Sequence, residues 1–234
     1  MAAIGDALRY PLQQDAWERL LLIGGILMLF GFLIIPLLVV YGYIVRVIKT
    51  RLEGADRPPA FGEWGSLLID GLKAFGIGFI YLLIPLIVGT VTFGGSIAAI
   101  AAGGRGGAAV GVAGLAAGMV VSFVLSLLFG YVAVAALVHF AHEDRFGAAF
   151  EFGAIKTIVL TEEYAIAWGL AVVVLIGASV VTGVLNLIPL FGTIFSVFVA
   201  FYIQVVAAKL WADGYKDARS HGEEVEMGGP DPTI

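Results

Sequence analysis

The sequence predicts an all-α fold, a bundle of helices that crosses a membrane several times. Hydrophobic residues make up 60% of the chain and charged residues only 13%, whereas soluble domains are about 45–50% apolar and about 25% charged. Four long segments contain no charged side chain: residues 20–45, 74–104, 106–138 and 164–208. A helix needs roughly 20 apolar residues to cross a bilayer, so each segment predicts at least one crossing.

The first uncharged segment, residues 20–45, is long for one crossing and short for two. Pro36 lies near its middle, and a proline inside a helix removes a backbone hydrogen bond. The segment is therefore either one kinked helix or a hairpin of two short helices. In the second case Arg19 and Arg46 would anchor the helix ends at the membrane surface.

The next two segments, residues 74–104 and 106–138, predict one crossing each. The glycine-rich stretch 93–118, centred on Arg105, lies between their apolar cores. Glycine in such density favours a flexible turn, so we expect a loop here that carries Arg105 outside the membrane.

The last segment, residues 164–208, is long enough for two crossings. Its sequence contains Asn186 and Pro189 in the stretch NLIP. Proline is tolerated in the first turn of a helix but not in its interior. We therefore predict that one helix ends near Asn186 and another begins just after it.

Similar sequences end three of the apolar stretches: GYIVRVIK from Gly42, GYVAVAALVH from Gly130 and FYIQVVAAK from Phe201. Amphipathic stretches at residues 61–75 and 149–163 follow the first two, as expected of helices that lie in the membrane interface. This repeat favours six helices arranged as three hairpins. The alternative has five spans, with the first segment crossing once.

The chain is expected to form a single transmembrane domain, residues 1–219, followed by an acidic tail. Residues 220–234 contain Glu223, Glu224, Glu226 and Asp231 and account for much of the formal net charge of −5. This composition predicts disorder. Residues 1–19 carry acidic side chains and lack the form of a cleavable signal peptide.

The basic residues predict the orientation, because Lys and Arg concentrate on the cytoplasmic side of membrane proteins. In the three-hairpin arrangement every Lys and Arg except Arg105 lies on one side. In the five-span arrangement Arg9 and Arg19 join Arg105. Both arrangements place the loops 46–73 and 139–163 and the C-terminus in the cytoplasm of a multi-pass plasma-membrane protein.

Several short stretches occur in the order found in one known family: residues 10–11 (YP), 15–17 (DAW), 23–25 (IGG), 41–46 (YGYIVR), 58–61 (PPAF), 70–75 (DGLKAF), 144–153 (DRFGAAFEFG) and 187–189 (LIP). Together they resemble an archaeal, largely haloarchaeal, family of integral-membrane proteins catalogued only as a domain of unknown function. The resemblance extends over residues 8–218. It implies a helical membrane domain from a halophile, in keeping with the acidic, cysteine-free composition, and it brings no activity.

The nearest approach to a ligand cluster is His139, His142 and Glu143. Histidines at i and i+3 share a helix face, so both could reach one Zn²⁺, but a catalytic zinc site needs three protein ligands. The simpler interpretation is a helix end at the membrane interface with solvated polar side chains. We therefore expect no metal, no cofactor and no catalytic residue.

Two other groups of residues are candidates for specific roles. The first is a series of glycines three or four residues apart: Gly107, Gly111, Gly114 and Gly118. Small residues at this spacing let helices approach closely, either inside the bundle or at a face for a second subunit. A basic cluster next to the first apolar segment fixes the orientation and contacts lipid headgroups; it comprises Arg46, Lys49, Arg51 and Arg57.

The spans contain no buried acidic or basic residue of the kind that ion or proton coupling requires. The sequence therefore favours a non-enzymatic integral-membrane protein that acts as an accessory, scaffold or lipid-interacting subunit. The alternative is a transporter or channel for a small neutral or amphipathic solute, because internal repeats are common in transporters. Expected partners are membrane lipids and a membrane protein or a second copy of the chain. Nucleic acid is not expected, because the chain has no basic domain.

Overall fold

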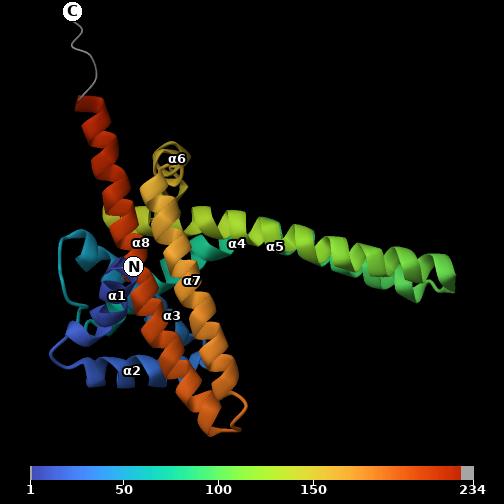
Figure 1. The fold of residues 1–234 in the computed structure, drawn as a ribbon, viewed down its shortest axis with the longest axis horizontal. Helices are drawn as coiled ribbons and strands as arrows, with labels where there is room; N and C mark the ends of the chain where they lie inside the picture. Colours follow the sequence, from blue (N-terminus) through green and yellow to red (C-terminus); the bar gives the residue numbers. More distant parts are fainter. Residues whose placement is uncertain (1, 228–234) are drawn as a thin grey trace, which may run out of the picture. The chain divides into compact units, whose positions relative to one another are not determined.

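A computed structural model describes residues 2–227, and the side chains of residues 4–104 and 106–220. Every element in this range is helical, which confirms the all-α prediction (Figure 1). The elements are α1 (Ala2–Arg9), η1 (Tyr10–Gln13), α2 (Trp17–Leu29), η2 (Gly31–Leu33), α3 (Ile35–Leu52), α4 (Trp64–Ala101), α5 (Gly104–Glu143), η3 (Phe146–Phe150), α6 (Phe152–Val159), α7 (Glu162–Leu185) and α8 (Phe191–Met227).

Four of the described helices are long and apolar enough to cross a membrane. They are α4, the part of α5 from Gly106, α7 and the part of α8 up to Ser220. These helices are consistent with a multi-pass membrane protein. The six crossing helices of the three-hairpin prediction are not confirmed, since neither α2 nor α3 is among the four.

The first uncharged segment folds as two helices with a sharp break between them. The break includes η2 and ends at Ile34, whose φ of 63° lies in the left-handed region that β-branched residues avoid. Pro36 is then in the first turn of α3. Backbone N–H groups in the first turn have no partner within the helix, so proline costs no hydrogen bond there. Because α2 has 13 residues, it is about 20 Å long, short of the roughly 30 Å that a bilayer core requires.

The chain divides into two compact units, one of residues 1–75 with 135–234 and the other of residues 76–134. In the first unit α8 is the central helix: it packs along α7 and also contacts α1, α2 and α3. Figure 1 shows α7 and α8 side by side, joined by a short turn. This turn spans residues 186–190, which confirms the predicted break at Asn186–Pro189.

Close backbone contact joins α3 to the first turns of α4 in this unit. A Cβ atom at Gly42 would overlap the backbone of Leu67, and one at Gly71 would overlap the backbone of Leu38. Hydrogen alone fits at both positions, so these two glycines set the distance between the helices.

The two stretches predicted as interfacial helices differ in the structure. Residues 64–75 are the first turns of α4 and continue without a break into its apolar part. One face of these turns is exposed, with Trp64 and Leu72 about half exposed, while Leu67 is fully buried. Residues 149–163 are divided among η3, α6 and the start of α7.

In the second unit, residues 76–134, α4 and α5 form a hairpin. Its turn is only two residues, 102–103, because both helices extend through most of the glycine-rich stretch. Gly103 and Gly104 supply the turn with φ values of 79° and 76°, which glycine adopts without strain. The loop predicted over residues 93–118 is thus much shorter than expected.

The predicted packing glycines lie on the side of α5 that faces α4. A Cβ atom at any of them would come within 2.6 Å of an α4 atom, closer than real Cβ contacts. The four are Gly107, Gly111, Gly114 and Gly118. In this structure they therefore serve packing inside the hairpin.

At the other end of the chain, α8 continues to Met227, so residues 220–227 of the predicted tail are helical, and residues 228–234 lie outside the described residues.

Candidate functional site

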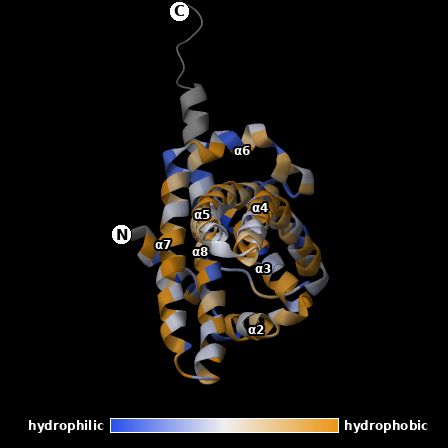
Figure 2. Ribbon diagram, turned by 90° about the vertical axis from the view of Figure 1, so that its right-hand side faces the viewer, coloured by the Kyte–Doolittle hydropathy of each residue, from blue (hydrophilic) through white to orange (hydrophobic). Residues whose placement is uncertain are grey.

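The basic cluster and the His139, His142 and Glu143 cluster singled out in the sequence lie in the first unit. Figure 2 shows the contrast between apolar and polar regions along one helix: α7 is orange along most of its length and blue at the end beside α6. The blue end contains Glu162 and Glu163, the only charged residues of α7. The charged side chains of α3, α4, α5 and α8 in this unit form a set of ion pairs described below.

Arg46, in α3, binds the chain just before and at the start of α4. Its guanidinium donates to the carbonyl of Gly62 over 2.7 Å and to the hydroxyl of Ser66 over 2.6 Å, and it lies 3.3 Å from the Glu63 carboxylate. Tyr43, one turn earlier, donates to the carbonyl of Pro59. These contacts fix the segment that leads into α4.

Lys49 joins two acidic residues that are far apart in the sequence. Its ammonium lies 3.3 Å from Asp70 in α4 and 2.5 Å from Asp144, just after α5. It also lies 5.8 Å from the centre of the Phe140 ring, and Lys73 lies 5.9 Å from the same ring, within the range of a cation–π interaction. Burial opposes the charge of Lys49, but the hydrogen bonds and charges of Asp144 and Asp70 outweigh it and raise the pKa of Lys49.

We expect the Lys49–Asp144 pair to make stability depend weakly on acidity. The hydrogen bond from Lys49 lowers the pKa of Asp144 from its ordinary value of 3.8. Since the folded pKa is the lower one, the pair stabilises the protein above pH 3.8 and the contribution is lost as the pH falls through the folded pKa. Asp144 is 73% exposed, so the effect should be about 0.5–1 kcal/mol at most.

This expectation is checked by measuring the melting temperature of the wild type and of Asp144→Asn between pH 7 and pH 3. The variant should melt slightly lower at neutral pH, and the two proteins should converge in acid. A constant difference over the whole range would contradict the role given to the Asp144 charge.

Arg51 and Lys209 converge on one carboxylate, that of Asp213. The Arg51 Nε lies 2.6 Å from one oxygen and the Lys209 Nζ lies 2.5 Å from the other. All three side chains are largely buried, with 23%, 11% and 26% exposed. This triad ties the end of α3 to the middle of α8. The last predicted basic residue, Arg57, pairs with Asp15 on the surface, where both are mostly exposed.

Tyr10 is fully buried beside this triad, with its ring 5.9 Å from the Lys209 ammonium. Burial raises the pKa of Tyr10 to about 12. Within the described part of the chain, its hydroxyl has no hydrogen-bond partner, and burying an unpaired hydroxyl costs about 1–3 kcal/mol.

We therefore expect Tyr10→Phe to be as stable as the wild type or more stable, as measured by thermal unfolding in detergent. The ring packing is kept and an unpaired polar atom is removed. Tyr43→Phe is the matched control, because its hydroxyl does have an acceptor, and it should destabilise by about 1 kcal/mol. A larger loss in Tyr10→Phe than in Tyr43→Phe would show that the Tyr10 hydroxyl has a partner.

The two histidines of the predicted ligand cluster make separate contacts. His139 is 7% exposed; its Nδ1 lies 2.6 Å from the Tyr215 hydroxyl and its Nε2 lies 3.4 Å from Glu151. Glu151 is also bound by Arg145 at 2.8 Å. His142 contacts Arg219 and lies 3.9 Å from Glu143. Among the residues that the structure describes, no group of three or more His, Cys, Asp or Glu is placed to hold a metal ion.

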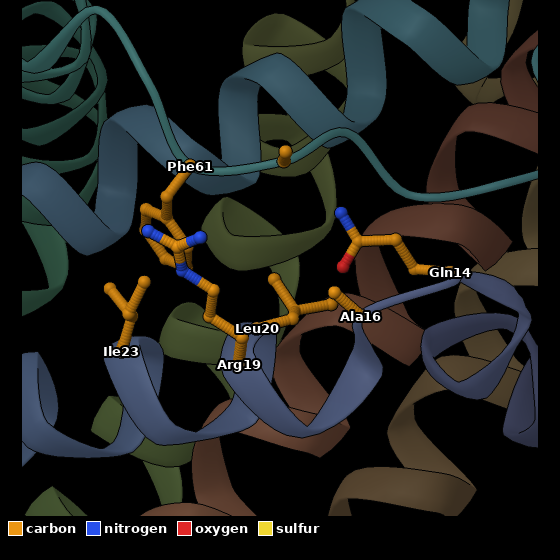
Figure 3. Close-up of a pocket in the computed structure, with 7 residues that line it drawn as sticks. Gln14, Ala16, Arg19, Leu20, Ile23 and Phe61 are labelled. Carbon is orange, nitrogen blue, oxygen red and sulfur yellow. The ribbon is translucent and has the colours of Figure 1, made fainter.

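A small pocket lies between the start of α2 and the segment before α4. Its volume is about 150 Å³, and its lining residues are Gln14, Ala16, Arg19, Leu20, Ile23, Ala60 and Phe61. Figure 3 shows Arg19 rising from α2 toward Phe61 and the amide of Gln14 pointing inward from the other side. The Phe61 ring is held by stacking on Tyr43 at 4.1 Å and on Trp64 at 5.8 Å, so this wall is rigid.

The comparison with known families covers most of this architecture. A model for a family of proteins of unknown function, DUF4013, matches residues 25–188. The chain belongs to the DUF4013 family. The matched region holds α3 to α7, with the four basic residues and the histidine cluster. The start of α2 and the whole of α8 lie outside it. No curated protein and no solved structure matches the chain.

The sequence did not reveal several residues that complete these clusters. Asp213, Tyr215 and Glu151 were not singled out. Asp213 and Tyr215 meet Arg51 and His139 across the fold, whereas Glu151 follows its partners His139 and Arg145 by 12 and 6 residues. Arg51 and Asp213 are 162 residues apart, and His139 and Tyr215 are 76 apart. The only available signal was that Asp213 lies four residues after Lys209, a spacing that favours an ion pair on a helix.

Proposed function

We propose that this DUF4013 protein is a non-enzymatic integral-membrane protein that acts as an accessory, scaffold or lipid-interacting subunit. The observation that carries the proposal is how little of its apolar helices the protein covers. In the most apolar stretch of each candidate crossing, only a minority of the residues are buried inside the protein: 22% in α4, 11% in α5, 11% in α7 and 44% in α8. Lipid or another protein must cover the rest, because exposed apolar area of this size is unfavourable in water.

The ion pairs support the same proposal. Arg46, Lys49 and Arg51 bind acidic residues of this chain, so they hold helices together and are only partly available to lipid headgroups. Ion or proton coupling would need acidic or basic groups within the spans, and the uncharged segments offer none.

We also propose the finer topology expected from the sequence, with six helices as three hairpins in the plasma membrane of a halophilic archaeon. The loop 53–63, the segment 144–161 and the C-terminus would then be cytoplasmic. The chain has no cysteine, so Ala3→Cys and Asp56→Cys can each be labelled with an impermeant thiol reagent on intact cells. Labelling of Asp56→Cys from outside would overturn the orientation, and labelling of Ala3→Cys alone would support five spans.

The role is tested by native mass spectrometry of the protein extracted gently from its own membranes, together with solute uptake by proteoliposomes that contain only this protein. A stoichiometric second protein, or retained lipid without uptake, would support the proposed role. Uptake of a neutral or amphipathic solute above empty liposomes would overturn it in favour of a transporter. The break between the short helices α2 and α3 is the feature that favours the transporter alternative, because interrupted helices line many transport sites.

A further inference from the structure

The pocket at the start of α2 contains polar groups that the protein itself does not satisfy. Arg19 is exposed at the rim of the pocket, and among the side chains that the structure describes it makes no hydrogen bond or ion pair. The Oε1 atom of Gln14 is buried without a hydrogen-bond donor. Two acidic residues lie between them in the sequence, Asp15 and Glu18. Asp15 is paired with Arg57, and among the described side chains Glu18 makes no ion pair with Arg19. The pocket thus presents a guanidinium that lacks an anion and a buried amide oxygen that lacks a donor.

These groups define the chemistry of a ligand. A guanidinium pairs best with a carboxylate or phosphate, and a buried amide oxygen requires an N–H or O–H group. The volume of about 150 Å³ exceeds what a single water needs and is below the roughly 300–1,000 Å³ of pockets that enclose whole drug-sized ligands. A phosphate ester with a hydroxyl group on a few carbon atoms satisfies all three requirements.

The surface next to the pocket indicates where such a phosphate ester comes from. Leu22 and Ile26 follow Arg19 at i+3 and i+7, so the three share one face of α2. Both are exposed, by 55% and 47%, and Leu29 continues the same face at 36%. Arg19 is also the last charged residue before the uncharged segment 20–45, the position at which lipid phosphates meet a membrane protein.

The packing next to the pocket holds the backbone of α2, which carries Arg19, in place before any ligand binds. A Cβ atom at Gly24 would overlap the Phe201 ring, and one at Gly25 would overlap the Phe198 ring, so α2 lies tightly against α8. Leu20, which lines the pocket, is only 2% exposed. A ligand therefore meets fixed apolar walls, and only the Arg19 side chain has to be ordered on binding, which limits the entropy cost.

We propose that this pocket binds the headgroup of an anionic, hydroxyl-bearing phospholipid, with the phosphate on Arg19, a headgroup hydroxyl on Gln14 and a hydrocarbon chain along Leu22, Ile26 and Leu29. The proposal rests on the membrane location given in the proposed function but not on an accessory role. Phosphatidylglycerol has the required phosphate diester and hydroxyl groups. Phosphatidylcholine has the phosphate diester but no hydroxyl in its headgroup.

The test is native mass spectrometry of the delipidated full chain in detergent, titrated with phosphatidylglycerol, phosphatidylcholine or glycerol 3-phosphate. We expect one tight phosphatidylglycerol per chain. Arg19→Gln should weaken it by on the order of tenfold or more, whereas Arg9→Gln, which removes the same charge from an exposed site in α1, should not. Gln14→Met should reduce the preference for phosphatidylglycerol over phosphatidylcholine. All three variants are expected to keep the wild-type melting temperature.

Three results would overturn the proposal. Equal lipid binding by Arg19→Gln and the wild type, or equal losses in Arg19→Gln and Arg9→Gln, would show that the pocket is not the site. Glycerol 3-phosphate that binds as tightly as the lipid would assign the pocket to a free phosphate ester. If none of the three compounds binds while a partner protein is retained in native extracts, the pocket proposal fails and the proposed function stands.

Discussion

Replacing Gly71 with valine should lower the free energy of unfolding by about 3 kcal/mol or more, the upper part of the range for overpacking. A Cβ atom at this position would overlap the carbonyl of Leu38 and approach the backbone of Gly42. A flexible side chain could move aside, but here the obstacle is the backbone of α3, so the two helices must separate. Thermal unfolding in detergent, followed by fluorescence of the four tryptophans, should show a melting temperature lower by about 6–12 °C.

Gly65→Val is the matched control on the same helix. A Cβ atom at Gly65 would meet nothing within 4 Å, so this substitution adds the same atoms without a clash, and its melting temperature should lie within about 2 °C of the wild type. Equal melting temperatures for Gly71→Val and Gly65→Val would contradict the close contact of α3 and α4.

Asp213→Asn should destabilise the protein by about 2 kcal/mol, because it leaves two largely buried cations without their shared anion. Breaking a fully buried pair costs about 3–5 kcal/mol, and the partial exposure of Arg51 and Lys209, 23% and 11%, reduces this value. The expected fall in melting temperature is about 4–8 °C.

Asp56 is the other acidic partner of Arg51, and its side chain is 92% exposed. Asp56→Asn should therefore lower the free energy of unfolding by less than about 1 kcal/mol. The two variants change the net charge equally, so a difference between them reports the position of the carboxylate. Similar small losses in both would show that the triad contributes no more than a surface ion pair.

The sequence predicted the helices well where composition alone determines them. The uncharged segments became α4, α5, α7 and α8, and the break at Asn186–Pro189 followed from proline chemistry. The glycine-rich stretch was interpreted wrongly as a long loop. The spacing of its glycines also places four of them on one face of a helix; they are Gly107, Gly111, Gly114 and Gly118. Their contact with α4 stabilises the helix by more than the conformational freedom of glycine destabilises it.

The clusters of the first unit were less predictable. The basic residues could be identified from one sequence, but their partners could not, because Asp213 and Asp144 reach them only through the packing of α8 and α5. The pocket depends on the segment 59–61 folding against the start of α2, which local patterns do not specify. Two short helices, α2 and α3, likewise could not be distinguished from one kinked helix, because Pro36 is compatible with both.

The central position of α8 has a consequence for the order of folding. The helix that α1, α2, α3 and α7 all contact follows all four in the chain and is synthesised after them, since chains grow from the N-terminus. The hairpin of residues 76–134 needs only neighbouring segments and can pair early. Until α8 is made, α1, α2 and α3 lack their main packing partner, and the space beside Gly24 and Gly25 is not yet filled by Phe201 and Phe198. Assembly of this unit is therefore a late, long-range step, and it is the stage at which a nascent chain is most exposed to quality control.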